Sequence, residues 1–318
     1  MRENPRTMST RAIVEGAIFA AIAIALYLLG NATQVVIILA YPVPAALIAQ
    51  RHGLKAGLMA SLVAALGIGM TLGPIHGIIS LLIIGVPGVV LGICMKKGFS
   101  WVSSTLITGA VLTFTTVADF VLGAFAIGIT PQKSLEELRT AMMASLETTK
   151  NFYAKINAGA EAMKQMDAMA EQMSFVVSKL LPAMVVISSL MTALIAYSIT
   201  RAVIIRMKGK ADPITKFEKW QLPVWFSWFP IIGLALPLIG GYVKMDWVTY
   251  LGNNLFTSAM MFYMVHSMAL LWFYLNQKGV PKFLRFIICG FLYITPLTSG
   301  ILPYAGVVDS FYDFRKLR

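Results

Sequence analysis

Long apolar stretches alternate with short polar intervals along most of this chain, and the stretches are close in length to membrane-spanning helices. About 20 apolar residues are needed to cross the hydrocarbon core of a bilayer as a helix. The apolar stretches cover residues 12–30, 34–49, 54–72, 75–95, 102–129, 175–205, 222–241, 248–275 and a last segment from about residue 286. The pattern therefore predicts an all-α fold, a polytopic transmembrane helical bundle with eight or nine membrane helices.

The second apolar stretch is the least regular of the set. It is short and contains Pro42 and Pro44. Proline interrupts helical hydrogen bonding, and free backbone groups at membrane depth must face protein or a water-lined cavity. We expect a broken or partly re-entrant helix here.

One long polar interval, Pro131 to Ser174, divides the chain into three parts. These are N-terminal membrane helices over 1–130, an insertion over 131–174 and C-terminal membrane helices over 175–318. Thr130 and Pro131 suit an N-cap and a first helical position, and Ser134 and Glu137 have the spacing of a capping box.

The apolar residues of the insertion recur at helical spacing and are interrupted at Asn157 and Gly159. This predicts two amphipathic helices that pack as a hairpin, with the second continuing into the next membrane span. The pattern allows three interpretations of this insertion. It could be a solvated structure that shields its own apolar stripe, a lid over a substrate site, or a surface that binds a protein partner.

Composition agrees with a membrane protein. Hydrophobic residues make up 58% of the chain, charged residues only 13%, and the mean hydropathy is +0.76. The net charge of +12 resides in short clusters between apolar segments, the arrangement that sets membrane orientation, so we exclude nucleic acid as a partner. Cys94 and Cys289 are isolated from other cysteines and histidines, which indicates neither a disulfide nor a metal site.

The distribution of basic residues predicts that the N-terminus is cytoplasmic and the insertion extracytoplasmic. With that orientation the short outer loops contain only Lys244, and the region from Lys133 to Lys179 balances six basic residues against six acidic ones. The sixteen basic residues of the inner segments are Arg2, Arg6, Arg11, Arg51, Lys55, Lys96, Lys97, Arg201, Arg206, Lys208, Lys210, Lys216, Lys219, Lys278, Lys282 and Arg285.

The C-terminal tail conflicts with a ninth crossing. Nine crossings would place Arg315, Lys316 and Arg318 outside. The last apolar segment contains Pro296 and Pro303, so it either crosses or turns back as a re-entrant hairpin. The sequence leaves both arrangements open.

The chain lacks the motifs of common enzyme classes. It contains no GxxxxGK[ST] phosphate-binding loop and no HExxH, GxSxG or CxxC pattern. Its three histidines, His52, His76 and His266, are far apart in sequence. We therefore expect no catalytic residues, no metal site, no cofactor and no enzymatic activity.

Small residues recur at four-residue spacing in the first apolar stretch. Such a face allows another helix to approach closely. It packs within this protein or forms a docking face for a separate subunit. The residues are Gly16, Ala17, Ala20, Ala21 and Ala25.

Asp119 is the most informative polar residue because it lies inside an apolar stretch with no basic residue within two turns. A carboxylate at membrane depth must be paired, protonated or in contact with water. It either pairs structurally, with His76, His266 or nearby threonines, or contacts a substrate or ion. Glu15, by contrast, can pair with Arg11 one turn away.

Further polar residues gather at the outer ends of the apolar stretches, above Asp119. Together they suggest a solute site open to the outside, centred on Asp119. The candidate neighbours are Asn31, Gln34, His76, Asn253 and Asn254.

Four segments resemble the YybS-like family of uncharacterised bacterial membrane proteins, a domain of unknown function. They are Ser9–Leu29, Tyr41–Pro44 with Gln50–Gly53, Phe217–Pro223 and Val308–Lys316. The first half is distantly similar to the substrate-binding S components of energy-coupling-factor transporters. That likeness implies a small-residue first helix that docks on a shared transmembrane coupling subunit driven by ATPases. The length of the chain, its insertion and its additional C-terminal helices depart from S components.

The resemblance implies a multi-pass protein of the bacterial cytoplasmic membrane, with the lipid bilayer as its environment. The leading hypothesis is an S-component-like protein that binds or transports a small solute from the outer face, with energy from a partner. The alternative is a non-transport scaffold or regulator of envelope assembly that binds a protein through the outer hairpin.

Overall fold

The computed structural model describes residues 9–33, 40–156 and 159–317, and this part of the chain is helical with no strand. Residues 81–85 and 176–180 form π-helical turns, and residues 217–219 and 224–227 form 3-10 turns. The elements are α1 (Thr10–Thr33), α2 (Pro42–His52), α3 (Leu54–Leu72), α4 (Pro74–Ser80), η2 (Leu81–Gly85), α5 (Val86–Lys96), α6 (Trp101–Ala126), α7 (Pro131–Lys155), α8 (Gly159–Phe175), η3 (Val176–Leu180), α9 (Leu181–Arg206), η4 (Phe217–Lys219), η5 (Val224–Ser227), α10 (Trp228–Val243), α11 (Asp246–Gln277), α12 (Lys282–Ile294) and α13 (Pro296–Tyr312).

Seven helical stretches in the described residues are long and apolar enough to cross a membrane, and the bent pair α12–α13 would make eight. The expected helical membrane bundle is thereby confirmed. α2 is not among the seven because it has only 11 residues. Its first residues are Pro42 and Pro44, so the prolines stand in the first turn, where their missing N–H groups cost no helical bond.

The chain forms two compact units. The first contains the described residues up to Thr140 together with Ser188–Ile214, and the second contains Ala141–Ile187 and Thr215–Arg318. This partition differs from the sequence-based division at residues 130 and 174, because most of α9 packs with the N-terminal helices.

Close helix packing in the first unit depends on small residues. A Cβ atom at Gly88 would collide with the carbonyl oxygen of Pro42, and one at Gly92 would collide with that of Ala46. Because these glycines carry no side chain, the backbones of α5 and α2 come into direct contact. Ala46 is consequently fully buried.

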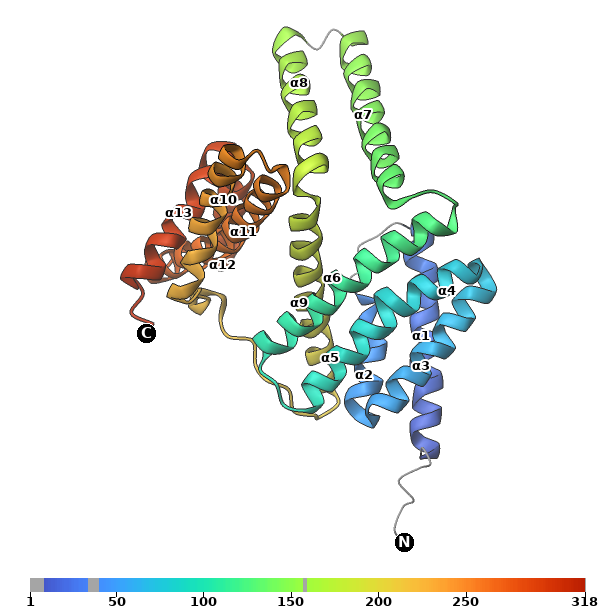
Figure 1. The fold of residues 1–318 in the computed structure, drawn as a ribbon. Helices are drawn as coiled ribbons and strands as arrows, with labels where there is room; N and C mark the ends of the chain where they lie inside the picture. The colour runs from blue at the N-terminus through green and yellow to red at the C-terminus, as the bar shows by residue number, and fades with distance from the viewer. Residues whose placement is uncertain (1–8, 34–39, 157–158, 318) are drawn as a thin grey trace. The chain divides into compact units, whose positions relative to one another are not determined.

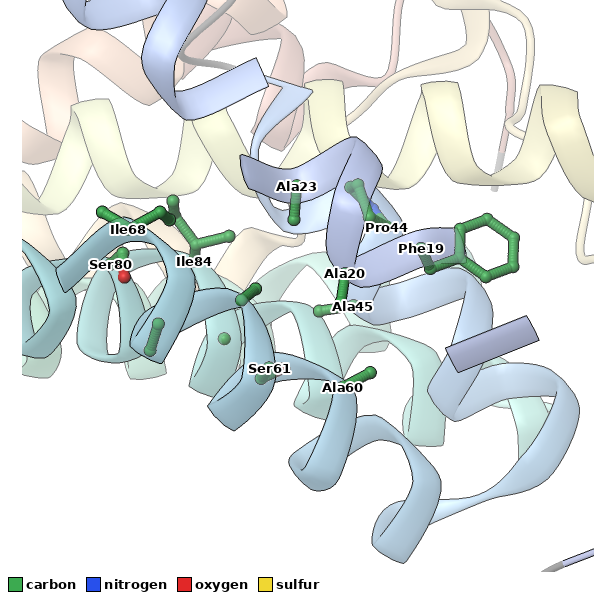
Figure 2. Close-up of a pocket in the computed structure, with 13 residues that line it drawn as sticks. Phe19, Ala20, Ala23, Pro44, Ala45, Ala60, Ser61, Ile68, Ser80 and Ile84 are labelled. Atoms are coloured by element: carbon green, nitrogen blue, oxygen red, sulfur yellow. The ribbon is translucent and has the colours of Figure 1, made fainter. Parts of the chain in front are cut away.

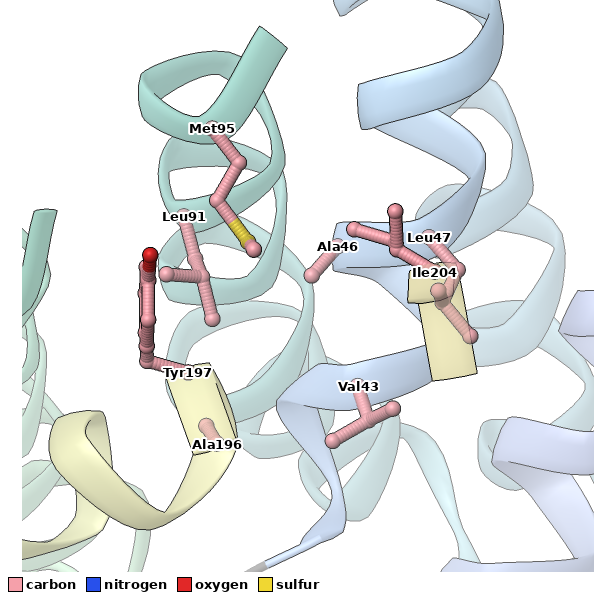
Figure 3. Packing of buried hydrophobic residues seen from close by; sticks show 8 residues of the cluster. All are labelled: Val43, Ala46, Leu47, Leu91, Met95, Ala196, Tyr197 and Ile204. Atoms are coloured by element: carbon pink, nitrogen blue, oxygen red, sulfur yellow. The ribbon is translucent and has the colours of Figure 1, made fainter. Parts of the chain in front are cut away.

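A buried cluster joins α2, α5 and α9 within the first unit (Figure 3). Tyr197 of α9 packs against Leu91 of α5, while Ile204 and Ala46 complete the contact with α2. The Tyr197 hydroxyl donates a 2.8 Å hydrogen bond to the carbonyl oxygen of Asp212. The Asp212 carboxylate in turn accepts from the backbone N–H of Trp101 at 2.8 Å, which ties the end of α9 to the start of α6.

α1 packs on α3 through small side chains (Figure 2). Ala20 and Ala23 of α1 are buried and pack with Ala64 of α3, and Ala60 and Ser61 of α3 also line this contact. The cavity left at this contact measures about 10 Å³, the space of a single water molecule at most. It is therefore a packing defect rather than a ligand site.

The insertion consists of α7 and α8, and α8 continues through η3 into α9 (Figure 1). The Thr130 hydroxyl caps α7 by accepting the N–H of Lys133, so Ser134 lies inside the first turn rather than at a capping box. α7 has no buried residue, and Lys150 and Asp167 form an ion pair between α7 and α8. Gly159 begins α8 with a φ of +86°, while Asn157 lies outside the described residues.

The second unit is built around α11, which packs against α10 and α13. Gly233 of α10 stands where a Cβ atom would collide with the backbone of Phe256, and Gly252 of α11 is similarly close to Pro237. α12 and α13 meet at an angle of 110°, which makes this pair a broken span or a re-entrant loop.

Candidate functional site

A cavity of about 340 Å³ lies inside the first unit, between α1, the start of α2, η2, α6 and α9. We call it the Tyr27 cavity. Its volume is within the range of small-molecule sites, about 300 to 1,000 Å³. It is lined by Tyr27, Gly30, Asn31, Tyr41, Pro42, Ile79, Ile83, Ile84, Leu112, Thr116, Ser188, Ser189 and Thr192.

Tyr27 connects the cavity to two of the residues that the sequence singled out. Its hydroxyl is hydrogen bonded to Nδ1 of His76 at 3.1 Å. It is also close enough to Asp119 for the two groups to interact electrostatically. Asp119 lies one turn beyond Thr116 on α6, so it stands next to the cavity without being part of its wall.

Tyr41 fixes the other wall. Its hydroxyl donates a 3.3 Å hydrogen bond to the backbone carbonyl of Tyr27, and the two rings lie 5.6 Å apart. A side chain at Gly30 would occupy the position of the Tyr41 hydroxyl. Tyr41 can therefore approach α1 this closely only because residue 30 is a glycine.

The chemistry of the Tyr27 cavity is that of a neutral binding site. Isoleucine, leucine and proline side chains make its apolar surface, and its polar groups are hydroxyls of α1, α6 and α9 with the amide of Asn31. None of the lining residues is charged. Such walls suit a small, largely apolar molecule that carries a few hydrogen-bonding groups.

The backbone at the cavity departs from the α-helix. Residues 81–85 form the π-helical turn η2, and Ile83 and Ile84 from this turn line the cavity. π-turns within α-helices occur frequently at functional sites.

The candidate residues separate into two groups. Asn31 lines the Tyr27 cavity, His76 bonds to Tyr27, and Asp119 lies one turn from Thr116 of the cavity wall. Asn253 and Asn254 belong to the second unit. Gln34 lies outside the described residues.

Asn254 has a clear local function at the start of α9. Its side-chain oxygen accepts the N–H of Ala183 at 3.0 Å, and its amide N–H₂ donates to the carbonyl oxygens of Lys179 and Tyr250. The bonds to Lys179 and Ala183 pair backbone groups in η3 and at the start of α9, whereas the bond to Tyr250 lies within α11.

Asp119 has neither of its proposed histidine partners. His76 bonds to Tyr27, and His266 bonds to Asp309. Asp119 forms no ion pair with any described residue, and its side chain is half-buried. It therefore remains the unpaired carboxylate beside the cavity.

Sequence reasoning missed the tyrosines and the polar face of α9. A lone tyrosine in an apolar stretch is typical of a membrane interface, and serine is common in membrane helices. The available signal was helical spacing, because Tyr27 and Asn31 lie four residues apart on one face, as do Ser188 and Thr192.

Glu15 forms a charged cluster at the opposite end of α1. It pairs with Arg11 at 2.9 Å, as the spacing indicated, and also with Arg51 at 3.0 Å and His52 at 2.7 Å. The cluster joins the start of α1 to the end of α2. α2 is therefore antiparallel to α1, since Tyr41 at its other end contacts Tyr27.

The small residues of α1 lie on two different faces. Gly16 and Ala20 are buried against α3, whereas Ala17, Ala21 and Ala25 are exposed. The first pair serves packing within this chain. The second group forms an outward stripe, which we call the exposed alanine stripe.

The second unit contains a buried charged network of His266, Asp309 and Arg315, which we call the Asp309 network. Asp309 bonds to Nε2 of His266 at 2.8 Å and to a guanidinium nitrogen of Arg315 at 2.8 Å, and its side chain is fully buried. Arg315 also donates to the carbonyl oxygens of Glu218 and Trp220. The C-terminal tail is thus fixed to the segment around η4.

Ser310 gives this network the residue types of a hydrolase triad. Its hydroxyl is 3.5 Å from Nδ1 of His266 and also bonds to the carbonyl oxygen of Gly306. Ser310 and Asp309 are both fully buried. The arrangement stabilises the contact between α11 and α13.

Metal binding has no obvious basis in the described residues. No three histidine, cysteine, aspartate or glutamate side chains of this part of the chain gather closely enough to hold an ion.

Comparison with known proteins confirms the resemblance to the YybS-like family and finds no similarity to S components of energy-coupling-factor transporters. The chain is 24% identical over 316 residues to the uncharacterized protein YybS of Bacillus subtilis (strain 168), covering 96% of this chain and 98% of the relative. No solved structure matches. The family model described as "Predicted membrane protein (DUF2232)" matches residues 17–310, and the chain therefore belongs to the DUF2232 family of predicted membrane proteins.

Proposed function

We propose that the first unit binds a small solute in the Tyr27 cavity and that the protein acts as an S-component-like binding or transport subunit. The observation that carries this proposal is the cavity itself, about 340 Å³ of space with hydroxyl and amide groups on apolar walls. A helix bundle that only anchors a protein in lipid gains nothing from such a space, because unfilled volume lowers stability.

Asp119 defines the class of solute further. It is a carboxylate without an ion-pair partner among the described residues, one turn from the cavity wall, and it interacts electrostatically with Tyr27. A solute with an amine or another hydrogen-bond donor at one end and an apolar body would satisfy both the carboxylate and the cavity. The energy for transport comes from a separate transmembrane coupling subunit with ATPases, since the chain contains no phosphate-binding loop of its own.

The membrane orientation of the proposal places the cavity toward the outside. With the N-terminus cytoplasmic, α1 ends outside and α2 returns, so Glu15 and its partners lie inside while Tyr27, Tyr41 and His76 lie near the outer end. The localisation is the bacterial cytoplasmic membrane. The hairpin α7–α8 is then extracytoplasmic.

The experiment compares two serine-to-leucine variants of α9. Ser189→Leu fills the cavity, whereas Ser198→Leu lies on the same helix outside it. Small molecules retained by each purified protein are identified by mass spectrometry. We expect the wild type and Ser198→Leu to retain one compound and Ser189→Leu to lose it. Asp119→Asn should also lose the compound while its apparent melting temperature stays close to that of the wild type.

Retention of the same compound by Ser189→Leu or Asp119→Asn would remove the cavity from the proposal. The same conclusion would follow if the folded wild-type protein retained no compound and no added cell extract supplied one.

A second candidate function rests on the hairpin. Its apolar side chains are exposed in the described residues, among them Leu138 at 41%, Phe152 at 59% and Met169 at 50%. Exposed apolar stripes on amphipathic helices are typical of protein interaction surfaces. On this reading the protein is a scaffold or regulator of envelope assembly, and it should copurify with an envelope protein and without ATPases.

A further inference from the structure

The second unit contains a groove that the solute-binding proposal does not use. It lies between η4, α11 and α12 and measures about 780 Å³. Three basic residues line it, Lys216, Lys282 and Arg285. We call it the basic groove.

The walls of the basic groove are aromatic. Trp272 stands edge-on to Phe286, with ring centroids 4.8 Å apart, and edge-on to Phe217 at 5.8 Å. Tyr293 and Cys289 continue the wall along α12. The basic groove therefore has basic side chains at one end and a continuous aromatic and apolar wall along the rest of its length.

The charge of the groove is uncompensated. Glu218 is the one acidic residue among its lining residues, against three basic ones. The Glu218 carboxylate already accepts a 2.7 Å hydrogen bond from the side-chain amide of Asn276. The groove consequently has an excess of positive charge and of hydrogen-bond donors.

Arg285 supplies a second, independent observation. Its guanidinium lies over the Trp272 ring, 5.0 Å from the centroid. Its Nε atom is buried and has no hydrogen-bond partner among the described residues. Because Nε is buried, an acceptor in the groove can reach only the terminal nitrogens of the Arg285 guanidinium, which are not among the buried atoms.

α12 places this groove beside lipid. None of its described residues is buried, and Phe283, Phe291 and Ile294 are all more than 60% exposed. A helix with basic residues at its start and an aromatic, apolar surface is typical of the boundary between lipid headgroups and acyl chains.

We propose that the basic groove binds one anionic phospholipid. Its phosphate oxygens accept hydrogen bonds from Lys216, Lys282 and Arg285, and an acyl chain follows Phe286 and Tyr293 along α12. A lipid fits better than free phosphate, because the apolar length of the groove is continuous with the exposed surface of α12. Basic pockets on membrane helices recognise lipid headgroups through the same electrostatic attraction.

Cys289 allows a direct test, because a lipid in the groove would cover its thiol. The purified full-length protein in neutral detergent is treated with a maleimide, and modification of the Cys289 peptide is followed by mass spectrometry. Phosphatidylglycerol, phosphatidylcholine and inorganic phosphate are added in separate arms. We expect phosphatidylglycerol alone to slow the modification.

The variant Lys216→Gln/Lys282→Gln removes two charges from exposed side chains, so its folding should be unaffected. It should need about tenfold or more phosphatidylglycerol for the same protection. The matched control Lys210→Gln/Lys278→Gln removes the same charge from exposed residues that do not line the groove, and should behave as the wild type.

Three results would overturn the proposal. Equal protection by phosphatidylcholine would show that the headgroup charge is not recognised. Equal protection by inorganic phosphate would identify a site for a soluble anion instead of a lipid. Equal responses of the two double variants would show that Lys216 and Lys282 do not hold the phosphate.

Discussion

At the scale of single residues, Asp119 and Asp309 have opposite environments. Asp119 lacks an ion-pair partner in the described residues, whereas Asp309 is fully buried between His266 and Arg315. The sequence singled out Asp119 because no basic residue is near it on its own helix. It could not reveal the Asp309 network, because His266 lies 43 residues from Asp309 and the basic tail resembles an ordinary orientation signal.

Arg315 and Lys316 offer a matched test of that network. Arg315→Met leaves Asp309 buried with only part of its compensation, and breaking a buried ion pair costs about 3 to 5 kcal/mol. We expect a marked fall in the apparent melting temperature of the detergent-purified protein. Lys316→Met changes an exposed residue and should leave it unchanged. Similar melting temperatures for both variants would contradict a structural function for Arg315.

At the scale of elements, sequence reasoning was most accurate where glycines bound a helix. The stretch 54–72 was located to the residue, because Gly53 and Gly73 at its ends both have positive φ, a conformation that ends helices. Sequence reasoning was least decisive for α12 and α13, because Pro296 permits both a crossing and a bend. The contacts of the tail favour the bend. Arg315 binds the η4 segment, and Asn276 at the end of α11 binds the same segment.

Two neighbouring alanines of α1 allow internal packing and partner docking to be tested separately. Ala20 is 3% exposed against α3, so Ala20→Leu should overpack this contact and cost about 1 to 3 kcal/mol. Ala21 belongs to the exposed alanine stripe, so Ala21→Leu should leave the melting temperature unchanged. If a coupling subunit docks there, Ala21→Leu should reduce its recovery in copurification. Unchanged recovery with Ala21→Leu would exclude the stripe as the docking face.

At the scale of the whole molecule, the number of membrane crossings decides where the tail lies. α2 runs antiparallel to α1, but its 11 residues are too few to cross the hydrocarbon core as a helix on their own. If the segment that contains α2 makes a crossing and α12–α13 is a re-entrant pair, we expect eight crossings. That arrangement would remove the conflict between nine crossings and the basic tail, because the tail would then lie on the same side as the N-terminus.

Cysteine labelling tests this arrangement. In intact cells a membrane-impermeant thiol reagent should modify cysteines introduced at Lys155 and Lys164 of the hairpin, both exposed. A cysteine at Lys316 should react only after the membrane is permeabilised. Labelling of Lys316→Cys in intact cells would show that α12–α13 crosses the membrane. Hairpin cysteines that require permeabilisation would reverse the whole orientation.

The position of Arg315 also affects the biogenesis of the protein. The ribosome adds this residue after every described membrane helix has been synthesised, so α11 enters the bilayer with His266 and without the Asp309–Arg315 pair. Until the tail arrives, the histidine and the carbonyl groups around η4 lack their final partners. Insertion factors and membrane proteases therefore meet an incomplete second unit, and nascent chains released before residue 315 should be preferential substrates for degradation.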